Sequence, residues 1–329
     1  MTASTGGYIQ GALEQAPNAE GGANAVSSVV VYHPGISIDM DPKVAVLERK
    51  DELRGGFWAM PHSGAASYDP DGTMEGRVYP NAIGQLLSCA IGIDTPTTAN
   101  STKVHTYTWN QTETPQTMQL IFAPPAGGFW KATGVGVDEL EFKTENNAWN
   151  YTAKLMGLKA ATISDPTLTT AYEVPGPWRA GEMALSWLSG SAVTEEFTWH
   201  IKNGLKQERS FTTSSLYPTS LVYEQALPVV GGTISKRSLD SDDWAELTAG
   251  TPFAASITMT HSEHVQGTSI HYTLTATMPA CQYVTVKADA IKNERRNKAS
   301  FDWEARYDTQ TAGFCAVVLV NDTATYATY

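Results

Sequence analysis

Apolar and polar side chains alternate with a period of two residues along most of this chain, and this alternation restricts the fold more than any other feature. In the segment 271–278, Tyr272, Leu274, Ala276 and Met278 would all lie on one face of a strand. The same alternation occurs in Ser28–Tyr32, Val104–Trp109, Met118–Phe122, Val135–Lys143, Trp149–Leu155, Glu195–Lys202, Ala255–Thr260 and Ala299–Arg306. Parallel strands, which are buried on both faces, would instead show continuous apolar runs. The alternation therefore predicts an all-β fold of half-buried antiparallel strands.

Only a few short helices are expected between these strands. The segment Asn81–Ala90 carries apolar residues at helical spacing, with a proline near its start and a glycine after its end. The segment Asp240–Leu247 begins with residues that can cap a helix and precedes a glycine. A third short helix is expected at Glu182–Leu188, after a Pro-Gly-Pro sequence.

An internal repeat accompanies the first two helices. Each helix follows a strand that begins with Gly-Thr, and the matching residues are separated by a constant 160 positions: Gly72, Thr73, Arg77 and Leu87 recur as Gly232, Thr233, Arg237 and Leu247. Each half also ends in a strand pair joined by a polar turn, at 145–147 and at 294–296. The sequence therefore predicts two tandem copies of one β-sandwich or barrel domain. We expect an N-terminal arm at 1–26, the first domain at 27–161, a linker at 162–192 and the second domain at 193–329.

Each copy contains one unusually long excursion, at 42–65 and at 203–225. Structureless loops of this length usually have a function, and exposed aromatic residues are costly unless something covers them. We therefore interpret both segments as contact arms for another subunit; the alternative is a variable surface flap. The candidate contact residues are Arg49, Asp51, Glu52, Arg54, Phe57, Trp58, Glu208, Arg209, Phe211 and Tyr217.

The charge balance and the cysteines exclude some classes of protein. The 22 basic and 34 acidic residues give a net charge of −12, which argues against an ordinary nucleic-acid binder with a basic surface. Cys89, Cys281 and Cys315 stand in apolar surroundings and are odd in number, so we expect buried thiols made in a reducing cell. No secretory signal is expected in the first ten residues, and no apolar run approaches the roughly 18 residues of a membrane helix.

No motif in the sequence predicts catalysis, a metal or a cofactor. A nucleophile elbow and a phosphate-binding loop are both missing. His261 and His264 would point to opposite faces of a strand, which disfavours a metal site. The acidic groups Asp138, Glu139 and Glu141, Glu195 and Glu196, and Asp240, Asp242 and Asp243 could serve a glycosidase only if two carboxylates faced each other. We read the last group as favourable charge at a helix N-terminus.

Several short strings follow one another in a fixed order along residues 27–329. They are Gly72-Thr73-Met74-Glu75-Gly76 leading into Asn81–Ala90, Val135–Lys143 with a paired strand ending in Leu155-Met156-Gly157, the Asn203-Gly204-Leu205 turn, Pro228–Ile234, and the closing strand Ala316–Asn321. In this order they resemble the tail tube proteins of long-tailed bacteriophages.

The resemblance implies a structural virion protein without catalytic residues, metal or cofactor. In such proteins the sheets of neighbouring domains join into one inner β-barrel. Six domains surround a lumen, and stacked rings form a tube through which the genome passes. If each chain supplies two domains, three chains complete a ring with pseudo-sixfold symmetry; a single-domain relative would need six. The implied partners are copies of the chain itself, tape-measure and tail-end proteins, and DNA that passes non-specifically through the lumen. The implied location is the virion tail, after assembly in the host cytoplasm.

A lumen that binds phosphates would hold DNA back, so we expect a lining with net negative potential. The candidate lining residues are Asn150 and Asp302 with Glu304, or alternatively Glu139 and Glu141.

Two other functions remain open from the sequence. A carbohydrate-binding or adhesin β-sandwich could stack Trp58, Trp130 and Trp178 on sugars, and a β-rich hydrolase could use a pair of carboxylates.

Overall fold

The structure is a computed structural model. It describes residues 8–15, 26–47, 64–92, 94–99, 102–109, 115–123, 128–164, 166, 175–188, 194–210, 216–224, 228–236, 241–288, 299–309 and 313–326. The described part is almost entirely β and contains two α-helices, α1 (Ile83–Ala90) and α2 (Ser241–Ala249), and one 3-10 helix, η1 (Ala180–Glu182). The all-β fold with few short helices is therefore confirmed.

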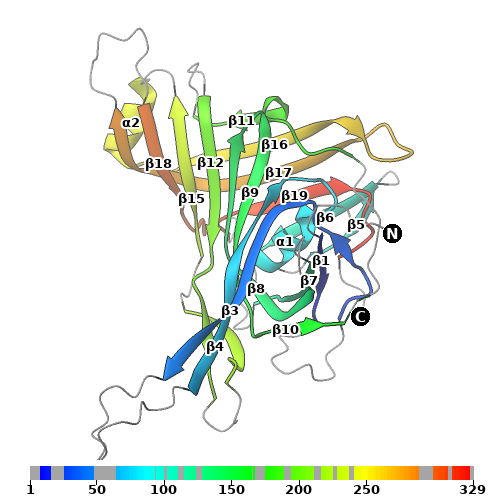
Figure 1. The fold of residues 1–329 in the computed structure, drawn as a ribbon. Coiled ribbons are helices and arrows are strands. Elements are labelled where there is room, and N and C mark those ends of the chain that lie inside the picture. Colours follow the sequence, from blue (N-terminus) through cyan, green and yellow to red (C-terminus); the bar gives the residue numbers. More distant parts are fainter. Residues whose placement is uncertain are drawn as a thin grey trace, which may run out of the picture.

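One long antiparallel sheet runs through the whole molecule (Figure 1). Its strands, in spatial order, are β3 (Gly35–Leu47), β4 (Gly64–Arg77), β9 (Ala148–Met156), the C-terminal half of β8 (Phe129–Glu145), β12 (Thr194–Lys202), β15 (Val229–Lys236), β18 (Ala299–Ala305) and the C-terminal half of β17 (His271–Ala288). The pairing of β8 with β12 makes the sheet continuous across the middle of the chain.

Two short sheets complete the fold, and the N-terminal halves of β8 and β17 belong to them. The first short sheet contains β2 (Val31–Tyr32), β1 (Tyr8–Leu13), β7 (Met118–Ala123), β8 and β10 (Lys159–Ile163). The second contains β11 (Met183–Ser186), β16 (Phe253–His264), β17, β19 (Ala316–Asn321), β6 (Thr102–Thr108) and β5 (Thr97–Ala99). A separate hairpin pairs β13 (Leu205–Glu208) with β14 (Ser220–Tyr223).

The same strand order occurs twice in this arrangement. In the long sheet, β3-β4-β9-β8 is followed by β12-β15-β18-β17, and each half carries a β-bulge at the same place of its second hairpin. The bulge in β8 falls between Val137 and Glu139, and that in β17 falls between Tyr283 and Thr285. In the short sheets, β1 pairs with β7 as β11 pairs with β16. We call the two halves the first and second repeat.

The two glycines of the repeated Gly-Thr sequence also have the same surroundings. A Cβ on Gly72 would lie 1.7 Å from the carbonyl oxygen of Asp39 on β3, and one on Gly232 would lie 2.0 Å from the carbonyl oxygen of Thr198 on β12. Only glycine lets the backbones approach this closely. The sequence repeat therefore marks a repeated packing requirement.

A continuous core lies between the long sheet and the short sheets. The alternating apolar residues of the long sheet are buried, and the largest are aromatic: Phe142, Trp149, Phe197, Trp199 and Trp303. Phe142 of β8 stacks on Trp199 of β12 with ring centroids 4.8 Å apart, so the core also joins the two repeats. The predicted faces of 271–278 are correct, because Tyr272, Leu274, Ala276 and Met278 are all buried.

Two of the three expected helices are confirmed as α1 and α2. The helix expected at Glu182–Leu188 is wrong, because the chain there forms η1 followed by strand β11, which pairs with β16. Met183 and Leu185 alternate with exposed residues and pack against the core. The pairing of this segment with β16 therefore determines its structure, although the local spacing of its apolar residues is helical. The excursion expected at 42–65 is shorter than predicted, since β3 continues to Leu47 and β4 begins at Gly64.

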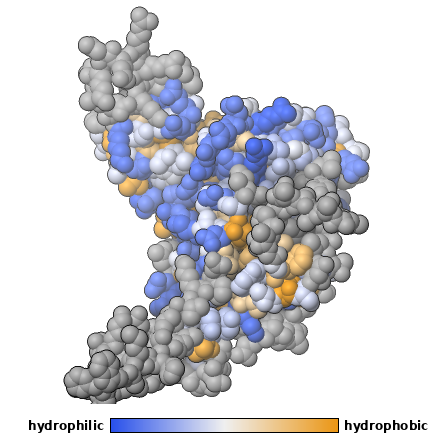
Figure 2. All heavy atoms as spheres, viewed as in Figure 1, coloured by the Kyte–Doolittle hydropathy of each residue, from blue (hydrophilic) through white to orange (hydrophobic). Residues whose placement is uncertain are grey.

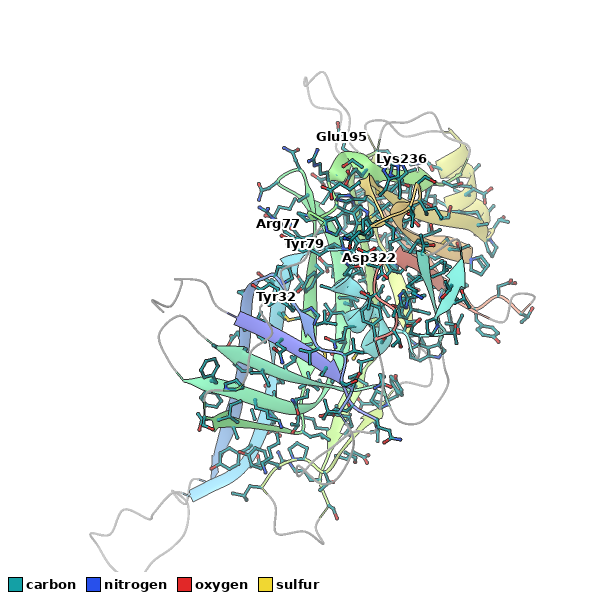
Figure 3. All side chains as sticks on the ribbon, turned by 90° about the vertical axis from the view of Figure 1, so that its right-hand side faces the viewer. Tyr32, Arg77, Tyr79, Glu195, Lys236 and Asp322 are labelled. Atoms are coloured by element: carbon teal, nitrogen blue, oxygen red, sulfur yellow. The ribbon has the colours of Figure 1, made fainter. Side chains whose placement is uncertain are left out.

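The end of the chain fastens the second repeat to the first. β6, from the first repeat, pairs with β19 of the second. His105 of β6 is buried and contacts Asp94 through Nδ1 at 2.6 Å, and Asn321 Oδ1 and the Thr323 carbonyl through Nε2 at 3.0 and 2.8 Å. Tyr326 is fully buried, and its hydroxyl donates to the Asn81 carbonyl at 2.7 Å. Figure 3 labels the neighbouring Asp322, whose backbone N–H donates to Asn81.

Acid is expected to destabilise the fold through His33. Burial lowers the pKa of His33 to about 4, although its hydrogen bond to Gln85 opposes this shift. The unfolded chain then binds the proton first, so stability falls as the pH falls from about 6.5 to about 4, by about 3 kcal/mol. Urea unfolding at pH 7 and pH 4 measures this loss. His33→Asn should lose about 3 kcal/mol less than the natural chain over the same interval, and equal losses would contradict the assignment.

Candidate functional site: the polar face and open edges of the long sheet

The side of the long sheet that faces away from the core is polar. Between the buried positions of each strand stand charged and hydroxyl side chains, such as Thr152 and Lys154 on β9 and Thr198 and Lys202 on β12. All five predicted lining residues lie on this one face: Glu139, Glu141, Asn150, Asp302 and Glu304. The two sets that the sequence offered as alternatives therefore share a face, because the register pairs Glu139 with Lys154 and Lys143 with Asn150.

Glu139 joins three strands at the centre of this face. Its carboxylate forms ion pairs with Lys154 of β9 and, at 3.1 Å, with Lys202 of β12. Partial burial by itself would raise the pKa of Glu139, but the hydrogen bonds from the two lysines outweigh it and hold the pKa below its usual value. Glu139 thus stays ionised and links the first repeat to the second. The lysines that surround it carry no signal in the sequence alone.

Other groups on the polar face are held neutral or paired. His200 of β12 stands opposite Glu141, and burial together with Lys202 lowers the pKa of His200 to about 4. Asp302 accepts a hydrogen bond from the Thr285 hydroxyl. Acidic residues on the polar face outnumber basic ones. The acidic residues include Asp39, Glu75, Glu139, Glu141, Glu196, Asp302 and Glu304, and the basic residues are Arg77, Lys143, Lys154, Lys202 and Lys287.

The long sheet has two open edges. Among the strands that the structure describes, β3 pairs only with β4, and residues 282–288 of β17 pair only with β18. Such edges expose unpaired backbone donors and acceptors that another strand can satisfy. Val284 lies at the bulge of the β17 edge and is 44% exposed.

The pairing of β8 with β12 shows how two such edges fit together. The strands are antiparallel, with Lys143 opposite Thr198 and Glu139 opposite Lys202. Beyond this ladder, the backbone carbonyl of the bulge residue Asp138 accepts a hydrogen bond from the Asn203 N–H, and its Oδ1 accepts one from the Leu205 N–H, both at 2.7 Å. We call this contact the internal joint. Asp138 and Asn203 have structural roles here that the sequence does not signal.

The hairpin of β3 and β4 extends beyond the body of the molecule (Figure 1). Two predicted contact residues brace its lower part. Arg209 donates to the Tyr68 carbonyl at 3.0 Å and pairs with Asp69. Tyr217 stacks on Tyr68, with ring centroids 4.9 Å apart. Glu208 is exposed at the end of β13. The other predicted contact residues, Arg49, Asp51, Glu52, Arg54, Phe57, Trp58 and Phe211, lie outside the described residues.

Several sequence expectations about chemistry can be placed in the structure. His261 is buried whereas His264 is exposed, so the two rings do point apart as predicted. Across the described segments, no group of three His, Cys, Asp or Glu side chains is placed to hold a metal ion. All three cysteines are buried and unpaired. Trp178 is fully buried, so the expectation that it stacks on a sugar is wrong; Trp58 is outside the described residues.

Figure 2 shows one face of the molecule, where hydrophilic residues predominate over the upper part and smaller apolar patches lie below. Within the described ranges, none of the helices has the length and apolar character needed to cross a membrane.

The chain is all-β, its long sheet joins two repeats edge to edge, and among the described strands this sheet ends in two open edges that can accept further strands. Residues 21–317 match the family model described as phage tail tube protein. The match covers most of the chain, and the chain therefore belongs to the phage tail tube protein family. It is a structural protein of the phage tail. No curated protein matches the chain.

Proposed function

We propose that three copies of this chain form a closed ring with pseudo-sixfold symmetry, and that stacked rings form the tube through which DNA leaves the virion. The observation that supports the ring is the internal joint. Within the chain, β12 of the second repeat pairs with β8 of the first repeat. The strand of the second repeat that corresponds to β8 is β17, and β17 has an open edge. The next chain offers β3, the counterpart of β12, with an open edge as well. The contact is heterologous, and such a contact forms a ring when the rotation between neighbouring subunits closes and an open filament when it does not; we propose that it closes after three chains.

The internal joint predicts a register for this contact between chains. The shared bulge relates β8 to β17, and the shared glycine relates β12 to β3. In this correspondence Lys287 takes the position of Glu141, and Asp41 takes the position of His200. Because Glu141 lies opposite His200 within the chain, Lys287 of one chain should lie opposite Asp41 of the next. Opposite charges directly across an antiparallel pair are favourable. This complementarity supports the proposed pairing.

The polar face of the long sheet then lines the lumen. Its acidic excess and its paired lysines give a surface that repels the phosphate backbone without trapping it. The proposed lining residues are Glu139, Glu141, Asn150, Asp302 and Glu304. An electron-microscopy map of the tube with the aromatic face toward the bore would contradict this assignment.

The β3–β4 hairpin is the proposed contact with the adjacent ring. It continues two strands of the long sheet beyond the body, and Arg209 and Tyr217 hold its lower part in place. We propose tape-measure and tail-end proteins as further partners, the virion tail as the location and the host cytoplasm as the place of assembly. The two repeats correspond to the two proposed tube domains. Strand pairing would place β1 in the first and β11 in the second, beyond the boundaries expected from the sequence.

A cysteine pair tests the ring. In Asp41→Cys/Lys287→Cys, oxidation of assembled tubes should link neighbouring chains into covalent trimers, seen on a non-reducing gel. The natural cysteines should not interfere, because burial raises the pKa of Cys281 and Cys315 to about 12 and raises that of Cys89 as well. Each single-cysteine variant serves as the control and should give monomers.

The size of the covalent product separates the alternatives. Covalent hexamers would show that the ring contains six chains instead of three. A ladder of longer products would indicate an open filament. Tubes that form but give no cross-link would show that neighbouring chains do not meet at Asp41 and Lys287. Purified protein that forms no rings or tubes in electron micrographs would overturn the proposed function.

A further inference from the structure

His105 lies at the contact that fastens the end of the chain to the first repeat, and the residue is fully buried. The contact is made by residues 321–326, which begin at the end of β19, and we call this segment the C-terminal latch. Its hydrogen bonds determine which atoms around His105 accept and which donate. They therefore also determine where the protons of the imidazole ring lie.

The surroundings of Nε2 are fixed by the side-chain amide of Asn321. Asn321 Nδ2 donates to the Pro80 carbonyl at 3.0 Å and to the Tyr326 hydroxyl at 2.7 Å. Its Oδ1 accepts from the Thr323 N–H at 3.0 Å, so the amide presents its oxygen to His105. His105 Nε2 lies 3.0 Å from this oxygen and 2.8 Å from the Thr323 carbonyl. Because both atoms are acceptors, Nε2 must carry a proton.

The other ring nitrogen of His105 faces a carboxylate. Nδ1 lies 2.6 Å from Asp94 Oδ2, and the side chain of Asp94 is only 7% exposed. A contact this short between a ring nitrogen and a carboxylate oxygen needs a proton between the two atoms. A carboxylic acid is a stronger acid than an imidazolium, so this proton belongs to the ring. The geometry therefore makes His105 an imidazolium and Asp94 its counter-ion.

Two tyrosine rings that face His105 are uncharged. The ring centroid of Tyr107, on the same strand, lies 6.4 Å from that of His105. Burial, followed by Tyr326 and Asp94, raises the pKa of Tyr107 well above its usual value. The ring centroid of Tyr326 lies 4.9 Å from that of His105, and its hydroxyl donates its proton to a backbone carbonyl at 2.7 Å. Neither tyrosine therefore supplies a charge that could replace Asp94.

Charged side chains on β6 and in the latch bind elsewhere. Lys103 Nζ donates to a hydroxyl on β5 at 3.0 Å, and Asp322 accepts from a backbone N–H in the turn between β16 and β17 at 3.1 Å. In the described part of the chain, Asp94 is thus the group that balances His105. We propose that the folded chain holds His105 as an imidazolium, so that closing the C-terminal latch takes up one proton and alkaline pH loosens the contact between the two repeats. This inference does not depend on the proposed ring.

The unfolded chain determines the sign of the effect. Above about pH 6.5 an unfolded histidine carries a proton on one ring nitrogen only, so the unfolded chain binds one proton fewer at this position than the folded chain. Stability therefore falls as the pH rises. A difference of one bound proton changes the unfolding equilibrium constant about tenfold per pH unit.

Asp94→Asn tests the inference, because it can keep the hydrogen bonds while it removes the charge. With the amide nitrogen donating to Nδ1, a neutral ring protonated at Nε2 satisfies every contact. Between pH 7.5 and pH 8.5 the unfolding equilibrium constant of the natural chain, measured with urea, should rise about tenfold more than that of Asp94→Asn. Burial raises the pKa of Cys281 and Cys315 to about 12, which also lowers stability in alkali, but equally in both chains. Asp302→Asn, the same substitution on the polar face, should keep the pH dependence of the natural chain.

Nitrogen NMR of protein labelled at its histidine rings gives the protonation directly. At pH 7.5 both ring nitrogens of His105 should carry protons in the natural chain, whereas His33, whose pKa burial lowers to about 4, should be neutral. The signal of His105 is the one that changes in Asp94→Asn, where only Nε2 should be protonated. An unprotonated ring nitrogen of His105 in the natural chain, or the same pH dependence in the natural chain and in Asp94→Asn, would overturn the inference. If Asp94→Asn does not fold, His105→Asn identifies the signal, and the spectrum of the natural chain decides.

Discussion

Gly232→Ala is expected to lower the free energy of unfolding by at least about 3 kcal/mol. The new Cβ would lie 2.0 Å from the Thr198 carbonyl oxygen, 2.8 Å from the Thr198 carbonyl carbon and 3.1 Å from Trp199 Cα. All three are backbone atoms, so no side-chain rotation relieves the clash, and β12 must move away from β15. Trp199 also stacks on Phe142 across the internal joint. The movement therefore disturbs both repeats, and urea unfolding measures the loss.

Gly181→Ala is the matched control for this prediction. No atom lies within 4 Å of a Cβ built on Gly181, and the free energy of unfolding should change by less than about 0.5 kcal/mol. Gly72→Ala should behave like Gly232→Ala, because its Cβ would lie 1.7 Å from the Asp39 carbonyl oxygen. A loss in only one of the two repeats would show that the glycines do not have the same role.

Lys236→Met is expected to cost about 3–5 kcal/mol. Lys236 Nζ lies 2.6 and 2.8 Å from the two carboxylate oxygens of Asp243, and both side chains are buried. Removing the lysine leaves the carboxylate charged and unpaired in the core. Tyr283 donates to the same carboxylate at 2.8 Å, and burial followed by Asp243 raises the pKa of Tyr283. One neutral donor does not replace the lost cation.

Asp243→Asn in the same chain should recover most of this loss. The amide keeps an oxygen for the Tyr283 hydroxyl and removes the unpaired charge. Lys143→Met is the control for losing a lysine at an exposed pair. Lys143 and Glu145 are 41% and 52% exposed, so the change should stay below about 1 kcal/mol. A double variant no more stable than Lys236→Met would show that packing, rather than charge, causes the loss.

Local patterns in the sequence were sufficient for most strands and for both α-helices. At 271–278 the alternation gives the buried face of β17, since burial of every second side chain is what produces the pattern. The turn at Asn146 and Asn147 was also predicted, and both residues have positive φ, 52° and 61°, which asparagine tolerates well. The helix expected at Glu182–Leu188 failed because the pairing of β11 with β16 depends on residues far along the chain.

The bend that carries β8 from the first short sheet into the long sheet had no local signal. Gly134 stands at the bend with φ +63°, and its N–H donates to the carboxylate of Glu14 at 3.0 and 3.1 Å. The Thr117 hydroxyl donates to the same carboxylate at 2.8 Å. Because Glu14 is 120 residues away, no pattern near Gly134 shows this contact.

For the proposed lining residues, the sequence predicted only that each lies on the polar face of its own strand. Alternation gives the polar side of each strand by itself, but it does not relate the polar side of β8 to that of β18. The register through β9 and β12 provides that relation, and it places Glu139 and Asp302 on one face. Asp138 and Val284 both occupy a bulge of the long sheet, and only the pairing of the strands shows that the two positions correspond.

The burial of Tyr326 against the first repeat sets an order for folding during synthesis. Its ring packs on Gly84 of α1, where a Cβ would lie 2.2 Å from the ring, and Ser27 donates to its carbonyl oxygen at 3.3 Å. N-terminal units usually fold first on the ribosome, but here the core of the first repeat is closed only once Tyr326 has been synthesised. A nascent chain that still lacks Tyr326 therefore carries an unfinished first repeat.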